Sequence, residues 1–183
     1  EKTSVFLYSE IMGYNYSIFD ELILRGYKLH VVHWNHKKIS NIKTASIDGL
    51  KLYNRSDLNY GDIIALIEQT QPQFIYVSGW MDKEYLKVVK RFKNKIPIIS
   101  GIDNKWEGTL KQHFLSIISR FTIKKYFDFF WVAGSKQRVF ANKLGYPKDK
   151  IINYLYCADI NKFKNQTGSK RLIEDQEYPK TIY

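Results

Sequence analysis

Seven short apolar segments recur along the chain, separated by segments with helical periodicity. They lie at residues 4–9, 29–34, 50–54, 74–80, 96–100, 129–135 and 151–156. They are rich in Val, Ile, Phe and Tyr and lack regular apolar–polar alternation, which is typical of parallel strands buried on both faces. Strands that alternate with helices indicate βαβ units. We therefore expect an α/β fold, a Rossmann-like open and mainly parallel sheet of about seven strands with helices on both faces.

The segments between the predicted strands carry apolar residues at helical spacing. In residues 82–93 the apolar stripe consists of Tyr85, Val88, Val89 and Phe92. A second stripe, with members three or four residues apart, consists of Leu110, Phe114, Ile117, Ile118 and Phe121. Such spacing puts apolar side chains on one face of an amphipathic helix. Gly26, which follows an apolar segment, is suited to ending the first helix.

The end of the chain differs in composition from the rest. Residues 164–178 are polar and mostly aperiodic, which is typical of a linker. Residues 179–183 resemble the start of a further strand. We expect residues 1–163 to form one Rossmann-like domain, and residues 164–183 to form a linker and the start of a C-terminal domain.

Small, polar and aromatic residues gather where the predicted strands end. They are Glu10, Gly13, Tyr14, Asn15, Ser78, Trp80, Asp103, Asn104, Trp106, Glu107 and Ser135. In an open parallel sheet, ligands bind beyond the carboxyl ends of the strands, at the point where strand order reverses. Trp80 and Trp106 are suited to stacking on a sugar ring. Asp103, Asn104 and Glu107 are suited to bonding hydroxyl groups, so we expect a crevice that binds a hydroxyl-rich ligand.

Some of these residues also have a structural interpretation. Asp and Asn are preferred at helix N-caps, so Asp103 or Asn104 is also suited to capping the helix that follows. Ser135 has the same alternative role. Capping does not explain two tryptophans at two different strand ends, so the ligand interpretation stays open beside it.

Several kinds of site are absent from the sequence. The first predicted strand is not followed by GxGxxG, and no acidic residue follows the second strand to hold a ribose. The pattern therefore argues against a nicotinamide dinucleotide site. GxxxxGK[ST] is also absent, which argues against a P-loop. His33 and His36 lack helical i, i+4 spacing and a third ligand, so we expect no metal site.

The order of elements resembles the N-terminal domain of GT-B glycosyltransferases, specifically the retaining family-four type. The resemblance spans Val5 to Phe163 and rests on three segments: SVFLYSEIMGYNYSIFDELILRGYKLHVVHW, PIISGIDNKWEGTLKQ and DFFWVAGSKQRVFANKLGYPKDKIINYLYCADINKF. The third segment resembles a family pattern carried here by Asp128, Ser135, Gly145, Lys150, Asp159 and Phe163. Two features depart from the family: the first loop has a single glycine, Gly13, and the 96–100 strand ends in Asp103 rather than His.

This resemblance implies retaining transfer of a sugar from a nucleotide-sugar donor to a saccharide or lipid-linked acceptor. It implies that Asp103 is catalytic and orients or polarises the acceptor hydroxyl. The residues implied to border or shape the acceptor pocket are Glu10, Gly13, Tyr14, Asn15, Ser78, Trp80, Asn104, Trp106, Glu107 and Ser135. The donor would be bound mainly by a C-terminal domain of the same chain. The expectation is therefore that this domain holds no cofactor and is inactive alone.

The positive charge is concentrated in the second part of the chain. The net charge is +11; residues 1–80 carry eight Lys/Arg and eight Asp/Glu, whereas residues 81–183 carry twenty-one and ten. We expect an anionic cytoplasmic membrane surface to be contacted by the basic side chains Lys83, Lys87, Lys90 and Arg91. The alternative is a solvated basic face.

Further features bear on location and on other functions. Cys157 is the single cysteine, which excludes an internal disulfide and favours a reducing, cytoplasmic compartment. No segment reaches the ~20 apolar residues that span a bilayer. The charge also fits a nucleic-acid-binding module, but no binding motif is present, so we do not expect a nucleic-acid partner. A non-catalytic, flavodoxin-like ligand-binding domain is the other alternative function.

Overall fold

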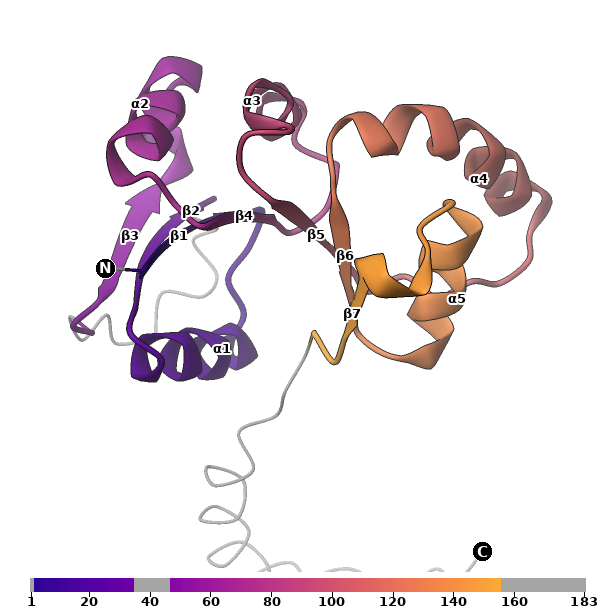
Figure 1. Cartoon of the computed structure of the whole chain (residues 1–183), viewed down its shortest axis with the longest axis horizontal. Helices are drawn as coiled ribbons and strands as arrows, with labels where there is room; N and C mark the ends of the chain where they lie inside the picture. Colours follow the sequence, from indigo (N-terminus) through magenta and orange to yellow (C-terminus); the bar gives the residue numbers. More distant parts are fainter. Residues whose placement is uncertain (1, 35–46, 156–183) are drawn as a thin grey trace, which may run out of the picture.

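The computed structural model describes residues 2–34 and 47–155 and confirms the predicted Rossmann-like α/β fold (Figure 1). The strands are β1 (Lys2–Tyr8), β2 (Tyr27–His33), β3 (Leu50–Asn54), β4 (Phe74–Val77), β5 (Ile98–Ile102), β6 (Phe129–Val132) and β7 (Ile151–Asn153). The α-helices are α1 (Gly13–Leu24), α2 (Tyr60–Thr70), α3 (Lys83–Phe92), α4 (Leu110–Thr122) and α5 (Ser135–Lys143). Short 3₁₀ turns are η2 (Arg55–Asp57), η3 (Ile123–Lys125) and η4 (Lys148–Lys150).

All seven strands pair in parallel, in the order β3-β2-β1-β4-β5-β6-β7. The chain builds β1, β2 and β3 outward in one direction and then returns to place β4 on the other side of β1. In the β1–β4 pair, Ser4 lies opposite Phe74 and Leu7 opposite Val77. The strand order therefore reverses between β1 and β4, the place where open α/β sheets bind ligands.

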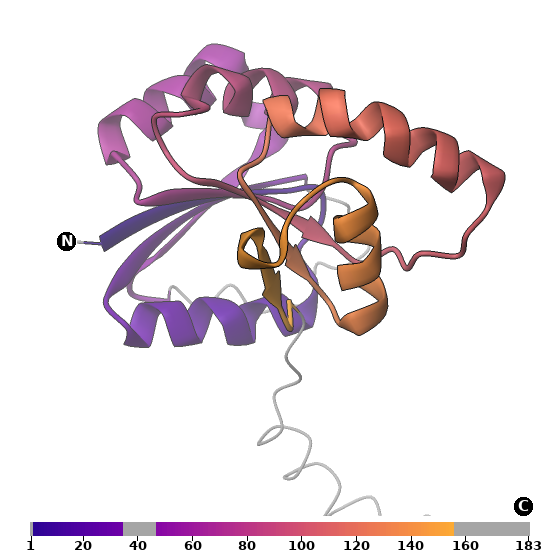
Figure 2. The same cartoon turned by 45° about the vertical axis from the view of Figure 1, so that its right-hand side comes forward.

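The two faces of the sheet pack against different helices. Consecutive residues of a strand point to opposite faces. Val5 and Leu7 join the core cluster that contains the buried residues of α2 and α3, whereas Phe6 and Tyr8 pack with Phe19 of α1. Figures 1 and 2 both show α2, α3 and α4 on one side of the sheet and α1 on the other. Residues 4–8 of β1 are buried by this packing, which explains the apolar sequence from Val5 to Tyr8.

Of the predicted strands, only 50–54 keeps its bounds in the structure, and β4, β5 and β6 show how the others differ. β4 ends at Val77 and β6 at Val132, each three residues before the predicted end. β5 begins at Ile98 and continues through Gly101 to Ile102, past the predicted end. A Cβ at Gly101 would overlap the Tyr76 hydroxyl from the neighbouring strand. Gly101 is therefore required by close side-chain packing within the sheet.

The predicted caps at Asp103, Asn104 and Ser135 are wrong. α4 begins at Leu110, and its N-cap is Thr109, whose hydroxyl accepts a hydrogen bond from the Gln112 N–H at 3.2 Å. The segment between β5 and α4 is thus longer than either capping role allows. Ser135 is the first helical residue of α5, and Gly134 is its N-cap.

Some sequence predictions lie outside the described residues. These are the linker and strand at 164–183, and the roles considered for His36, Cys157, Asp159 and Phe163. Within residues 2–34 and 47–155, no helix is both long and apolar enough to cross a membrane.

Candidate functional site

The ends of β1 and β4 are joined directly at the point where strand order reverses. The Ser9 N–H donates a hydrogen bond to Ser78 Oγ at 2.8 Å, and the two hydroxyl oxygens lie 3.1 Å apart. Gly79 follows with φ of 133°, a backbone conformation that side chains rarely adopt. These contacts fix the two strand ends relative to each other and place two hydroxyls at the point where strand order reverses.

The start of α1 follows the same junction of β1 and β4. The buried Asn15 holds the connecting loop, because its Oδ1 accepts a hydrogen bond from the Met12 N–H at 2.7 Å. Asn15 Nδ2 also lies 3.4 Å from Tyr8 Oη, to which it donates. By contrast, no atom lies within 4 Å of the position of a Cβ on Gly13. Asn15 is therefore a loop-fixing residue, whereas Gly13 leaves space beside the helix N-terminus.

The helices differ in how their positive N-terminal ends are balanced. The first turns of α2 and α3 contain Asp62 and Glu84, respectively. The first turns of α1, α4 and α5 contain no acidic residue. Carboxylates near a helix N-terminus offset the helix dipole, and where none is present the N–H groups favour an anionic ligand. The N-terminal ends of α1, α4 and α5 are therefore not offset by an acidic residue in their own first turn.

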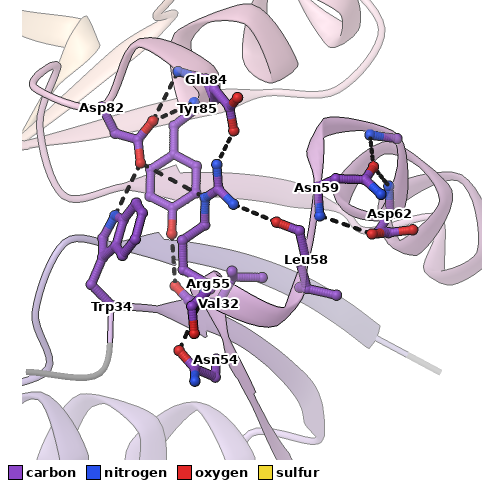
Figure 3. A network of polar contacts seen from close by, with 12 residues as sticks. Val32, Trp34, Asn54, Arg55, Leu58, Asn59, Asp62, Asp82, Glu84 and Tyr85 are labelled. Atoms are coloured by element: carbon purple, nitrogen blue, oxygen red, sulfur yellow. Dashed lines mark hydrogen bonds and ion pairs between the residues drawn. The ribbon is translucent and has the colours of Figure 1, made fainter.

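A buried arginine organises the neighbouring part of the same edge (Figure 3). Arg55 follows β3 directly and is only 6% exposed. Its guanidinium donates to the Glu84 carboxylate and to the Leu58 carbonyl. Its Nε lies 3.8 Å from Asp82 Oδ2 and, among the described groups, has no hydrogen-bond acceptor. Arg55 thus connects the end of β3 to the start of α3.

Two aromatic rings enclose this guanidinium. The guanidinium carbon lies 5.1 Å from the ring centroid of Trp34 and 5.6 Å from that of Tyr85, within cation–π range. Trp34 Nε1 donates to Asp82 Oδ2 at 3.0 Å. The Tyr85 hydroxyl donates to the backbone carbonyl of Tyr8 at 3.2 Å. These contacts, drawn in part in Figure 3, hold α3 against the ends of β1 and β2.

The environment of Tyr85 perturbs its ionisation. Burial raises the pKa of the Tyr85 hydroxyl well above its ordinary value, and the nearby Asp82 carboxylate raises it further. Arg55 acts in the opposite direction but more weakly. Tyr85 is therefore a neutral hydrogen-bond donor at physiological pH, and its role here is structural.

An open depression of about 630 Å³ lies beside this cluster. Its walls are formed by Ser9, Trp34, Arg55, Met81, Asp82, Lys83 and Glu84. Ser9 also belongs to the β1–β4 junction, so the depression adjoins that junction. The sequence predictions did not include Trp34, Arg55 or Asp82 in the site. The sequence does contain a signal for Arg55, because this charged residue comes directly after the predicted strand 50–54 and therefore lies at the carboxyl edge of the sheet.

The predicted site residues fall into two groups along the carboxyl edge. Glu10, Gly13 and Ser78 lie at the junction of β1, β4 and α1. Asp103, Asn104, Trp106 and Glu107 lie between β5 and α4. Asp103 is exposed, and its backbone carbonyl accepts a hydrogen bond from Gln137 Nε2 at 2.9 Å. The structure therefore brings the first group together at the reversal point and places the second near the start of α5.

Both predicted stacking tryptophans pack against the core. Trp80 is half-buried, with its ring centroid 6.1 Å from that of Phe130. Trp106 lies against Phe140 at 5.8 Å and edge-on to His113 at 4.8 Å. Each tryptophan thus has a packing role that needs no ligand, and the two rings belong to different parts of the edge.

A metal site was not expected from the sequence. Across the part of the chain that the structure describes, no group of three or more His, Cys, Asp or Glu side chains is placed to hold a metal ion.

Comparison with solved structures found several of similar arrangement, two of which are described here. One is the enzyme WbmH of Bordetella bronchiseptica in complex with NAD⁺, at 8% identity and a TM-score of 0.44, covering 98% of this chain and 84% of that one. The other is a short-chain dehydrogenase/reductase of Burkholderia vietnamiensis, at 8% identity and a TM-score of 0.34, covering 100% and 98%. No family model and no curated protein matches the sequence.

These findings correct the predicted membership of the GT-B glycosyltransferases. Neither structure is described as a glycosyltransferase, and no family model supports one. The predicted sugar-transfer function is corrected with it, whereas the role predicted for Asp103 is not tested and stays a prediction. The prediction that this domain holds no cofactor is also corrected, because the WbmH structure contains NAD⁺. At this level of similarity neither comparison assigns a ligand or an activity to this chain, and the Rossmann-like fold rests on the strand order described above.

Proposed function

We propose that this protein is a Rossmann-like ligand-binding domain that holds a phosphate-bearing ligand of nucleotide type at the carboxyl edge of its sheet. The observation that carries this proposal is the reversal of strand order between β1 and β4. Ligands of open α/β sheets bind at such a reversal, and the helix that follows the first strand supplies N–H groups to their phosphates.

The phosphate would lie at the start of α1. The first turn of α1 carries no acidic side chain, and the space beside Gly13 is open. The Ser9 and Ser78 hydroxyls lie at the adjoining junction and are suited to bonding phosphate oxygens. These features together favour an anionic group at this position.

The remainder of the ligand would extend over the depression beside Arg55. Trp34 offers a partly exposed aromatic surface at its wall, which is suited to stacking on a base. Lys83 adds an exposed positive charge at the same wall. Because Arg55 is already paired with carboxylates, its role is to fix the wall rather than to bind the phosphate.

The substitution Gly13→Asp tests the phosphate position. A carboxylate in the first turn of α1 repels a bound phosphate, but stabilises the helix by about 0.3–1 kcal/mol. We therefore expect affinity for a phosphate-bearing ligand to fall at least about tenfold, while the urea unfolding midpoint stays level or rises. Gly13→Asn has nearly the same shape without the charge and is the matched control.

Binding can be measured by titration calorimetry with a panel of ADP, GDP, UDP and NAD⁺, with adenosine as the ligand that lacks phosphate. The proposal expects at least one nucleotide to bind the wild-type protein and the Gly13→Asn variant alike. It is refuted if no nucleotide binds at millimolar concentration, or if Gly13→Asp and Gly13→Asn bind equally.

A further inference from the structure

Helix α4 presents its apolar stripe to solvent. The five residues that the sequence places on one helix face are between 41% and 89% exposed: Leu110, Phe114, Ile117, Ile118 and Phe121. Figures 1 and 2 show α4 at the outer edge of the molecule, on the same side of the sheet as α3. Apolar residues spaced by three and four positions form a continuous surface on a helix. None of the described residues covers this surface.

Two serines of α4 lie against the rest of the protein. Ser116 and Ser119 are only 7% and 5% exposed. Their hydroxyls donate to helix carbonyls, Ser116 to His113 O at 2.7 Å and Ser119 to Ser116 O at 2.9 Å. These two buried hydroxyls therefore have hydrogen-bond acceptors within the helix itself. The five exposed apolar side chains of α4 are available to another surface.

The charge around α4 indicates which kind of partner would cover its apolar face. From Lys105 to Lys125 the sequence contains five Lys/Arg residues and one Glu. Lys124 and Lys125 are exposed directly after the helix. On the neighbouring helix α3, Lys87 and Lys90 are exposed on the same side of the sheet. A second copy of this chain docked on α4 would bring two positive regions together, whereas an anionic surface complements them.

We propose that α4 is a membrane-docking helix, which lies in the headgroup region of an anionic phospholipid bilayer. Its apolar face inserts among the upper acyl chains, as amphipathic helices with exposed large apolar residues do. The lysines of η3 and α3 contact the lipid phosphates and add a salt-sensitive attraction. This places the predicted basic face of α3 beside the inserting helix. Lys87 and Lys90 contribute to it, whereas Arg91 is already paired with Glu68 at 3.0 Å.

Vesicle co-sedimentation tests this proposal. The 183-residue chain is mixed with vesicles of phosphatidylcholine alone, or of phosphatidylcholine with about one third phosphatidylglycerol. We expect the wild-type protein to pellet with the anionic vesicles, and about 0.5 M NaCl to weaken this binding. The double variant Phe114→Ser/Phe121→Ser should bind at least about tenfold more weakly, because it removes two exposed rings from the inserting face.

A matched control removes exposed apolar side chains elsewhere. Leu24 and Ile152 are 83% and 41% exposed and lie outside α4, so Leu24→Ser/Ile152→Ser should leave vesicle binding unchanged. Lys124→Glu/Lys125→Glu should remove the preference for anionic lipid. All three variants should unfold at urea concentrations close to that of the wild type, because every substituted side chain is exposed.

Three results would overturn the proposal. The first is a wild-type protein that does not pellet with anionic vesicles at low salt. The second is an equal loss of binding in Leu24→Ser/Ile152→Ser. The third is a dimer in sedimentation velocity that Phe114→Ser/Phe121→Ser converts to monomer, since α4 would then be covered by a second copy. The Gly13 variants do not alter α4, so failure here is distinguishable from failure of the nucleotide proposal.

Discussion

The clearest test of the carboxyl-edge architecture is to remove the guanidinium of Arg55. Arg55→Met keeps a long, unbranched side chain but removes the charge and all hydrogen-bond donors. Met retains apolar contact with the Trp34 and Tyr85 rings that enclose the guanidinium. The effect therefore reports on the polar contacts to the Glu84 carboxylate and the Leu58 carbonyl, and on the nearby Asp82.

The expected cost follows from the environment of each partner. Breaking a buried ion pair typically costs about 3–5 kcal/mol, because the remaining charge is left without a partner. Here the Glu84 side chain is 47% exposed and can be hydrated. Asp82 still accepts from the Trp34 indole and from the backbone N–H groups of Glu84 and Tyr85. The main cost is the loss of the charged hydrogen bonds and of two cation–π contacts. We expect Arg55→Met to lower the free energy of unfolding by about 3 kcal/mol.

Equilibrium urea unfolding at pH 7, followed by far-ultraviolet circular dichroism, measures this cost. With a slope of about 2 kcal/mol per molar, the midpoint should fall by about 1.5 M. Arg25→Met is the matched control, because the Arg25–Glu21 pair is exposed, at 69% and 58% of the two side chains, and should contribute less than about 0.5 kcal/mol. Equal midpoint shifts in the two variants would refute the idea that Arg55 organises this edge.

Two further substitutions test packing and ionisation in the core. Gly101→Ala should cost about 1–3 kcal/mol by overlap with the Tyr76 hydroxyl, and Tyr76→Phe in the same chain should recover part of the lost urea midpoint. Burial raises the pKa of both Tyr85 and Tyr146. Above pH about 10 the unfolded chain therefore releases the phenolic protons before the folded chain does. The stabilising effect of the two tyrosines is present below that pH and is lost as pH rises above it. Urea midpoints between pH 9 and 11 should decline less steeply in Tyr85→Phe/Tyr146→Phe than in the wild type or in the exposed control Tyr154→Phe; equal slopes would contradict this reasoning.

The fold could be predicted from the sequence because it depends on burial, which the apolar segments report directly. Val5 and Leu7 face one side of β1 and Phe6 and Tyr8 face the other, so both faces had to be apolar. The ends of the strands were harder to predict, because apolar residues continue along the chain after the last residue that pairs with a neighbouring strand. Trp80 shows why: it lies beyond β4, yet packs on Phe130 as a core residue.

The candidate site could be predicted only in part, because its members come from strand ends that are far apart in sequence. The parallel arrangement predicted that Glu10, Gly13 and Ser78 share one edge, and the structure confirms that position. The Arg55–Asp82–Trp34 cluster joins residues from three different segments, 48 positions apart at the widest bond. No local pattern in the sequence predicts such a contact. The cluster can be recognised only from the three-dimensional arrangement of β2, β3 and α3.

Helix α4 shows a different limit of sequence periodicity. Apolar residues at spacings of three and four positions predict that a helix has an apolar face, and the helix at Leu110–Thr122 confirms it. The spacing does not say which way that face points. In α3 the equivalent stripe, including Tyr85 and Phe92, is buried against the sheet, whereas in α4 Phe114 and Phe121 face solvent. The residues on the opposite face of each helix distinguish a buried apolar face from an exposed one. α3 is charged there, whereas α4 has Ser116 and Ser119, whose small hydroxyl side chains can lie against the protein without leaving a donor unsatisfied.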